Sequence, residues 1–136
     1  MISHTTRYGI STTVPVDYEQ AVERTRTALA AEGFGVLTEI DVRATLKQKL
    51  DVEFRPYVIL GACNPGFAHQ ALSVERDIGL LLPCNVIVYA ADAPHMSIVA
   101  AMDPVTALGL TGNEAVRPIA QQVRDGLERV LTAVRR

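Results

Sequence analysis

The sequence predicts a single α+β domain, and three patterns along the chain predict it. Residues 8–14 alternate between two faces, with Ile10 and Val14 on the apolar side, which is typical of a strand lying on a core. Residues 86–89 and 96–102 are rich in β-favouring side chains, and the turn between them suits an antiparallel hairpin. Residues 116–134 repeat apolar side chains with the period of an amphipathic helix.

Length and composition indicate an ordinary globular chain. The 136 residues are close to the usual size of one domain, and 49% of them are hydrophobic and 21% charged. These values exclude an intrinsically disordered or fibrous protein. No Ser/Gly-rich linker, charge block or low-complexity tract divides the chain, so we expect residues 1–136 to form one domain.

Charge and targeting signals restrict the partners and the location. The chain has 13 Lys and Arg against 15 Asp and Glu residues, so no positive field gathers phosphates and no nucleic-acid partner is expected. Residues 1–7 lack the basic and apolar regions of a secretory signal, and the longest apolar stretch, 78–91, is broken by Pro83 and Asn85. We therefore expect a soluble cytoplasmic protein, with no membrane partner and two free cysteines.

The first half of the chain predicts a strand, a helix, a strand and a second helix, in that order. Asp17 is expected to cap a helix over 18–32, with Gln20 completing a capping box. A short strand is expected over 36–40, and Asp41 can then cap the second helix. The apolar residues of this second helix recur on one face: Val42, Leu46 and Leu50.

The middle of the chain predicts a buried strand followed by a helix. Residues 57–60 are a continuous apolar run that Gly61 is expected to end. Asn64 and Pro65 are a cap and a first-turn proline for a helix that continues to Ser73. The residues expected on one stripe of this helix are Pro65, Ala68, His69 and Leu72.

The elements of the second half are punctuated by prolines. Residues 80–82 and 86–89 flank the Pro83-Cys84-Asn85 break, and the second of the two runs is the better strand. Asp103 followed by Pro104 repeats the cap-then-proline signal, and a short helix closed by Gly109 is expected there.

The densest group of chemically capable residues surrounds the two cysteines. Cys63 adjoins Asn64 and Pro65, and Cys84 lies between Pro83 and Asn85. We expect Cys63 just before a helix, where exposed backbone N–H groups and the helix dipole would lower the thiol pKa. His69 follows on that helix, and a cysteine near a histidine is the smallest arrangement for nucleophilic, redox or metal chemistry.

Each of these residues also has a purely structural explanation. A free cysteine is among the residues most often buried in packing, and a single His on a helical stripe is more often packed than a ligand. Cys63, His69 and Cys84 are only three scattered donors, so they are weak candidates and no metal is assigned. Asn64 and Asp103 both have the helix-cap explanation.

The remaining polar residues indicate no enzyme class. Glu39 and Asp41 are near neighbours at a strand end and a cap, while His4 and His95 fall at the terminus and in a loop. The sequence has no Gly-rich phosphate loop, no G-x-S-x-G motif and no H-E-x-x-H motif. Whether the protein is an enzyme stays open, and the balance favours a protein that is not one.

Several strings of residues, spread over most of the chain, resemble one protein family. They are GFGVLTEID at 33–41, LGACNP at 60–65, AH at 68–69, GLLLPCNV at 79–86 and MDP at 102–104. Their length makes the resemblance specific, and the family is the prokaryotic domain of unknown function 302 family, also called the TT-type TBP-like domain.

The resemblance implies a fold and an assembly but no activity. It implies a two-layer, TBP-like α+β fold with a mainly antiparallel sheet packed by helices, and commonly a homodimer. The family-type positions that this chain keeps are Cys63, Asn64, Pro65, His69, Pro83, Cys84 and Asp103.

Three functional hypotheses follow from the sequence. The leading one is a module that binds a small ligand, metal or haem between Cys63, His69 and Cys84, with the cofactor unknown. The second is a thiol-dependent redox enzyme or sensor that uses Cys63 as a low-pKa nucleophile. The third is a structural homo-oligomerising domain without a ligand. The candidate ligand-binding residues are Cys63, Asn64, Pro65, His69, Pro83, Cys84, Asn85 and Asp103.

Overall fold

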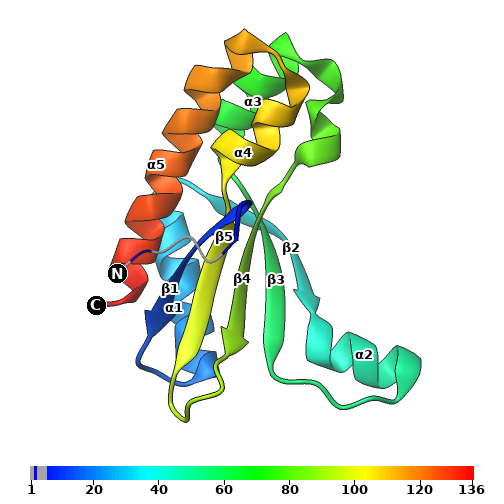
Figure 1. Ribbon diagram of the computed structural model, residues 1–136, viewed down its shortest axis with the longest axis vertical. Coiled ribbons are helices and arrows are strands. Elements are labelled where there is room, and N and C mark those ends of the chain that lie inside the picture. The colour runs from blue at the N-terminus through cyan, green and yellow to red at the C-terminus, as the bar shows by residue number, and fades with distance from the viewer. Residues whose placement is uncertain (1, 3–5) are drawn as a thin grey trace.

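A computed structural model describes Ile2 and residues 6–136 and contains five strands and five α-helices within them (Figure 1). His4, expected at a free terminus, lies outside the described residues. The strands are β1 (Gly9–Val14), β2 (Gly35–Asp41), β3 (Tyr57–Cys63), β4 (Cys84–Ala90) and β5 (Ser97–Met102). The α-helices are α1 (Tyr18–Ala31), α2 (Val42–Leu50), α3 (Pro65–Val74), α4 (Pro104–Leu108) and α5 (Arg117–Val134). Three 3₁₀ segments are η1 (Arg76–Leu81), η2 (Gly109–Thr111) and η3 (Glu114–Val116).

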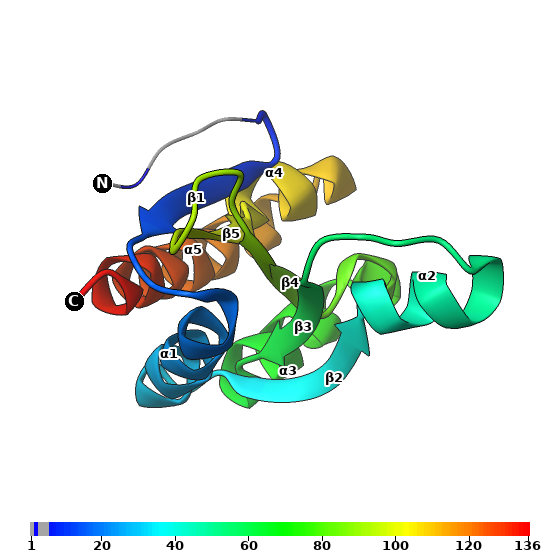
Figure 2. The ribbon, with the colours of Figure 1, turned by 90° about the horizontal axis from the view of Figure 1, so that it is seen from below.

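The five strands form one sheet in the order β1-β5-β4-β3-β2, and every neighbouring pair is antiparallel. Helices α1 and α5 pack against each other and against one face of the sheet (Figure 2). Helices α3 and α4 lie beyond one end of the strands (Figure 1). The α+β class with a mainly antiparallel sheet packed by helices is therefore confirmed.

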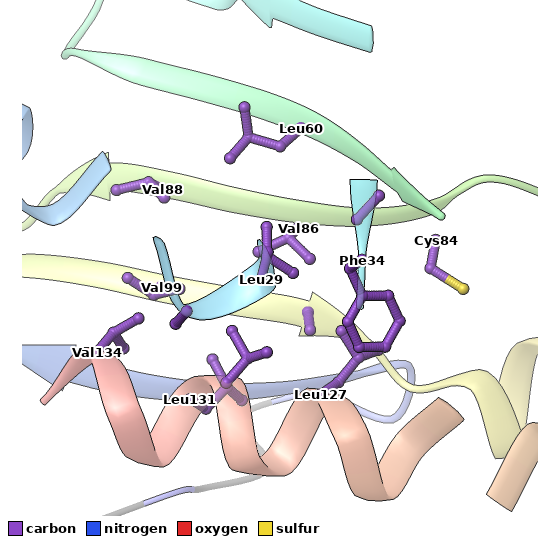
Figure 3. Packing of buried hydrophobic residues seen from close by; sticks show 14 of the residues in the cluster. Leu29, Phe34, Leu60, Cys84, Val86, Val88, Val99, Leu127, Leu131 and Val134 are labelled. Atoms are coloured by element: carbon purple, nitrogen blue, oxygen red, sulfur yellow. The ribbon is translucent and has the colours of Figure 1, made fainter. Parts of the chain in front are cut away.

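The main core lies between the sheet and the helix pair α1 and α5. Alternate strand residues such as Leu60, Val86 and Val99 point into it and are fully buried. Figure 3 shows Leu29 of α1 and Leu127 and Leu131 of α5 meeting these strand residues. The amphipathic pattern of residues 116–134 thus identified the correct buried face of α5.

A second, smaller cluster lies beyond the strand ends and joins the main core. Its buried members come from α3, η1, α4, η3 and α5: Ala71, Ile78, Leu108, Val116, Ile119 and Ala120. Phe67 and Leu82 pack against both clusters. The junction between the clusters is therefore at the ends of β3 and β4, where both cysteines lie.

Gly61 does not end its strand as predicted. It lies inside β3 opposite Asn85, and β3 continues through Cys63. A Cβ atom on Gly61 would lie 2.1 Å from Thr38 Oγ1 and 2.9 Å from Pro83 Cγ. Only glycine allows these two side chains to approach the strand so closely. Gly61 is therefore needed for the packing of Thr38 and Pro83 against β3, and it does not end the strand.

Two predicted helix details differ from the structure. The Asp17 side chain does not cap α1; its Oδ1 lies 3.0 Å from Nδ1 of His95, in the loop after β4. In α3 the buried residue is Ala71, with Phe67 and Ala68 half-buried, while His69 and Leu72 are exposed. The buried stripe of α3 is rotated from the predicted one because the second cluster lies on the Phe67 side.

Two apolar segments also have different roles from those expected. Residues 80–82 are not a strand, since η1 occupies Arg76–Leu81 and Leu80 is 88% exposed. Helix α2 follows Asp41 as predicted and has the predicted cap, with the Ala44 N–H donating to Asp41 Oδ1, but none of its residues is buried. Within Ile2 and residues 6–136, no helix is long and apolar enough to cross a membrane.

The close approach at Gly61 generates a stability prediction. We expect Gly61→Ala to lower the free energy of unfolding by about 1–3 kcal/mol, the usual range for overpacking. In a Thr38→Ala background the loss becomes smaller, because the nearest contacting atom, Oγ1, is gone. Urea unfolding of the four proteins measures both effects as a double-mutant cycle. Equal losses in the two backgrounds would show that Thr38 is not the constraint.

Candidate functional site

Both cysteines line one small cavity at the ends of β3 and β4. Cys84 is paired with Ala62 across the two strands, so Cys63 lies next to the residue opposite Cys84. Directly opposed residues in antiparallel strands have Cα atoms only about 4.5–5.5 Å apart. Both cysteines are free thiols; Cys84 is buried and Cys63 half-buried.

The cavity is small and almost entirely apolar. Its volume is about 30 Å³, room for a water molecule or one small ion. Phe34 and Phe67 line it together with Leu108 and Ile119 from the second cluster and Val123 from the main core. Figure 3 shows Cys84 at one end of the main core, beside Phe34. A cavity of this size does not enclose a haem.

The backbone around the cavity is positioned by local signals that the sequence contains. The Phe67 N–H donates to Asn64 Oδ1 at 3.2 Å, so Asn64 caps α3, and Pro65 follows in the first turn. Pro83, preceded by a cis peptide bond, packs over Gly61. Asn64 and Pro83 line the cavity with the two cysteines, whereas Pro65 is exposed and does not.

The thiols are held in the protonated form, contrary to the prediction for Cys63. Burial raises the pKa of the Cys63 thiol above its ordinary value. Burial, with a smaller contribution from the nearby Cys63 charge, raises the pKa of Cys84 to about 11. Cys63 precedes the start of α3 as expected, but removal of the thiol from water disfavours the thiolate. The Cys63 charge acts on the Cys84 thiol, so the two side chains are close enough to interact electrostatically.

His69 is not at the cavity. His69 is exposed on the outer side of α3, and it is not among the residues that line the cavity. Among the described residues, no group of three or more His, Cys, Asp or Glu side chains is placed to hold a metal ion. Both cysteines therefore line the cavity, and the imidazole does not.

The other two candidates, Asp103 and Asn85, lie elsewhere. Asp103 is buried and caps α4, accepting from the Val105 N–H at 3.0 Å, and it pairs with Arg124 at 3.3 Å from Nε to Oδ1. Asn85 is exposed on the opposite face of β4 from Cys84. Asp103 thus has the structural role that its following proline, Pro104, indicates.

The residues considered as an acid–base pair have structural roles as well. Glu39 forms an ion pair with Arg26, and Asp41 caps α2. His95 lies in the loop, as predicted, with its side chain exposed beside Asp17. None of these residues lines the cavity.

Sequence reasoning missed the two aromatic residues of the cavity. Phe34 is 3% exposed, and a Cβ on Gly126 would lie 3.1 Å from its ring, so the ring packs directly on α5. Phe67 was not placed on the inner stripe of α3. The available signal was the aromatic side chain itself, one helical turn before the small residue Ala71, which the second cluster buries.

Comparison with known proteins agrees with the resemblance noted in the sequence. A family model described as "Domain of unknown function DUF302" matches residues 10–134. Among solved structures, the crystal structure of an uncharacterized conserved protein DUF302 from Bacillus stearothermophilus superposes with a TM-score of 0.87. It is 28% identical, and the match covers 96% of this chain and 100% of that one. No curated protein sequence matches the chain.

Proposed function

Since the chain belongs to the DUF302 family, a domain of unknown function, we propose a function from its own residues: a module that binds one soft monovalent metal ion between Cys63 and Cys84. The observation that carries the proposal is that two free thiols line the same small apolar cavity. The module binds the ion and catalyses no reaction.

Donor chemistry selects the class of ion. Thiolate sulfur is a soft ligand that selects Cu(I) over hard cations such as Mg²⁺ or Ca²⁺. A structural zinc ion takes four ligands, and the described residues around the cavity supply two sulfurs and an apolar wall. Cu(I) accepts two thiolates, so the cysteine pair is sufficient for Cu(I) and insufficient for Zn²⁺.

Proton release couples this binding to pH. Each thiol must lose its proton to become a ligand, so one Cu⁺ ion replaces two protons and forms two Cu–S bonds. Burial raises the pKa of both thiols, so at neutral pH both are protonated before the ion enters. Affinity therefore increases with pH throughout the range below the two thiol pKa values.

The same pKa shifts argue against nucleophilic catalysis. A catalytic cysteine is activated by a pKa below the ordinary value, and both thiols here are shifted the other way. His69 is not in a position to serve as the base for Cys63 within the cavity. The hypothesis of a Cys63-dependent redox enzyme was based on a lowered pKa of the Cys63 thiol, and this pKa is raised instead.

Anaerobic titration with Cu(I) against a chromogenic chelator tests the proposal. The reduced protein is expected to bind one Cu(I) per chain, with apparent affinity rising by up to roughly 100-fold per pH unit, since two protons leave. Cys63→Ser and Cys84→Ser should each abolish tight binding. His69→Ala is the matched control and should leave the affinity unchanged. Equal Cu(I) affinity in the double serine variant would refute the thiol site.

A second candidate function, homodimerisation, is favoured by a separate feature: a projecting arm made of α2 and residues 51–56. Figures 1 and 2 show α2 standing apart from the other helices. Its nine residues include no buried one, although isolated helices shorter than about 12 residues are marginal in water. Intramolecular support comes from the Asp41 cap, the half-buried Val42 and Leu46 side chains and a ring contact between Phe54 and Tyr57. Exposed ion pairs of Lys47 with Asp51 and Glu53 add little, because such pairs are weak.

The surface of the arm is more apolar than an exposed helix needs. Leu50 is 65% exposed and Phe54 43%, and Leu37 and Ile40 are exposed on the adjoining strand β2. β2 is also an edge strand, whose outer backbone groups are open to pairing. We therefore propose that the arm and β2 contact a second copy of this chain, as the family resemblance also suggests.

Light scattering during size-exclusion chromatography tests the arm. The wild-type chain is expected to elute as a dimer, and Leu50→Glu with Phe54→Glu should convert it to a monomer that keeps its helical content. Leu80→Glu and Leu110→Glu are the matched controls, because these leucines are 88% and 78% exposed but lie outside the arm. A wild-type monomer at micromolar concentration, or dissociation by the control pair, contradicts the proposal.

A further inference from the structure

The sheet face opposite α1 and α5 is unusually apolar for a face without a helical cover. An antiparallel sheet with one solvated face normally carries polar side chains there. Here the outward positions of the three central strands carry mostly isoleucine, tyrosine, alanine and methionine, and most are half-buried. A contiguous apolar surface of this kind marks a place where another molecule binds.

Part of this face is hollowed into a groove, which we call the tyrosine groove. It has a volume of about 500 Å³, within the range of about 300–1,000 Å³ that small-molecule sites occupy. Ile87, Ile98 and Met102 line it between tyrosines from β3, β4 and the segment before β1. No residue of β2, α2 or the thiol cavity lines it.

The walls of the groove are aromatic rings held in place. Tyr57 and Tyr89 are directly opposed across β3 and β4, and their rings are stacked, with centroids 5.2 Å apart and planes at 8°. Tyr8, 67% exposed, lines the groove from the β1 side. A preorganised stacked pair presents a flat apolar surface without loss of side-chain freedom on binding.

The flat aromatic surface suits a planar ligand, and the charges of the lining side chains restrict the ligand further. None of the described residues that line the groove is Lys, Arg, Asp, Glu or His. Burial raises the pKa of Tyr57, with smaller contributions from Tyr89 and Tyr8, so its phenol stays neutral at physiological pH. The polar side chains that line the groove are those of three tyrosines, Thr6, Ser11 and Asn85. Such a site favours an uncharged ligand, because an ion would lose hydration without a counter-charge.

We propose that the tyrosine groove binds a neutral, planar aromatic small molecule, stacked beside the Tyr57–Tyr89 pair over the Ile87 and Ile98 side chains. The Asn85 amide at the groove supplies one donor and one acceptor that can select among ring substituents. The groove and the thiol cavity share no lining residue, so the binding test of either proposal can fail while that of the other succeeds.

Two fluorescent probes with the same ring skeleton test the proposal. The neutral N-phenylnaphthylamine is expected to bind at one site per chain, at least about tenfold tighter than its anionic sulfonate analogue. Ala100→Trp, which places an indole in the groove, should weaken the neutral probe by at least about tenfold. Ile59→Trp is the matched control: Ile59 pairs with Ile87 but does not line the groove, and binding should persist.

Thermal unfolding of both tryptophan variants shows whether they fold, and light scattering gives their masses. Equal affinity for the two probes, or unchanged binding by a folded Ala100→Trp variant, overturns the proposal. If instead the wild-type chain binds neither probe and Ala100→Trp turns a dimer into a monomer, the groove is an interface between copies, and the proposal also fails. If Ala100→Trp does not fold, Tyr8→Ala, at an exposed position, replaces it and should weaken the neutral probe.

Discussion

The pairing register of β3 with β4 is the constraint on which both candidate sites depend. It places Cys84 opposite Ala62 and thus beside Cys63, and at the other end of the same two strands it places Tyr57 opposite Tyr89. Because side chains alternate between the faces of a sheet, a slip of one residue would exchange the buried and open faces of either strand. The thiol cavity and the stacked tyrosines therefore share one structural cause.

Packing on both sides keeps this register. On the helix side, Leu60, Val86 and Val88 are fully buried and fit the core against α1 and α5. On the other side, Thr38 and Pro83 approach Gly61, which leaves no room for a side chain at that position. A shifted strand would bring a larger residue to this place, so the glycine contributes to the choice of register as well as to local packing.

Helices bury only one face of the sheet, and we expect interactions with other molecules on the surfaces that the helices leave uncovered. The helices cover one side of the sheet, and the opposite side keeps an apolar floor and a groove. The arm extends from the β2 edge without burying any residue of α2. The chain thus satisfies its own core, while two apolar surfaces, the groove and the arm, lie outside it; these are the surfaces for which we propose a ligand and a second copy.

Local signals in the sequence predicted most of the helices and strands. The sequence did not predict the features that depend on tertiary packing. The caps at Asp41, Asn64 and Asp103 are as predicted, since each depends on residues within three positions. The inner face of α3 was wrong because a short helix with several small apolar residues fits more than one stripe, and the position of the second cluster decides between them.

The residues that line the cavity were predicted in part. The proximity of two cysteines followed from the strings around them, but the pKa of Cys63 depends on burial by residues distant in sequence, such as Ile119 and Val123. A histidine five residues after an asparagine cap looks close to the thiol in sequence; in α3 it faces outward. The sequence did not predict the groove, because the residues that line it are spread over four segments of the chain.

The most direct measurement of the central claim is a nuclear Overhauser spectrum of the reduced, isotope-labelled protein in solution. Cross-strand contacts are expected between the backbones of Ala62 and Cys84 and between the rings of Tyr57 and Tyr89. Contacts that instead pair Gly61 directly with Cys84 would mean a shifted register. Such a result would separate the thiols from the cavity and the tyrosines from each other, and it would contradict both sites together.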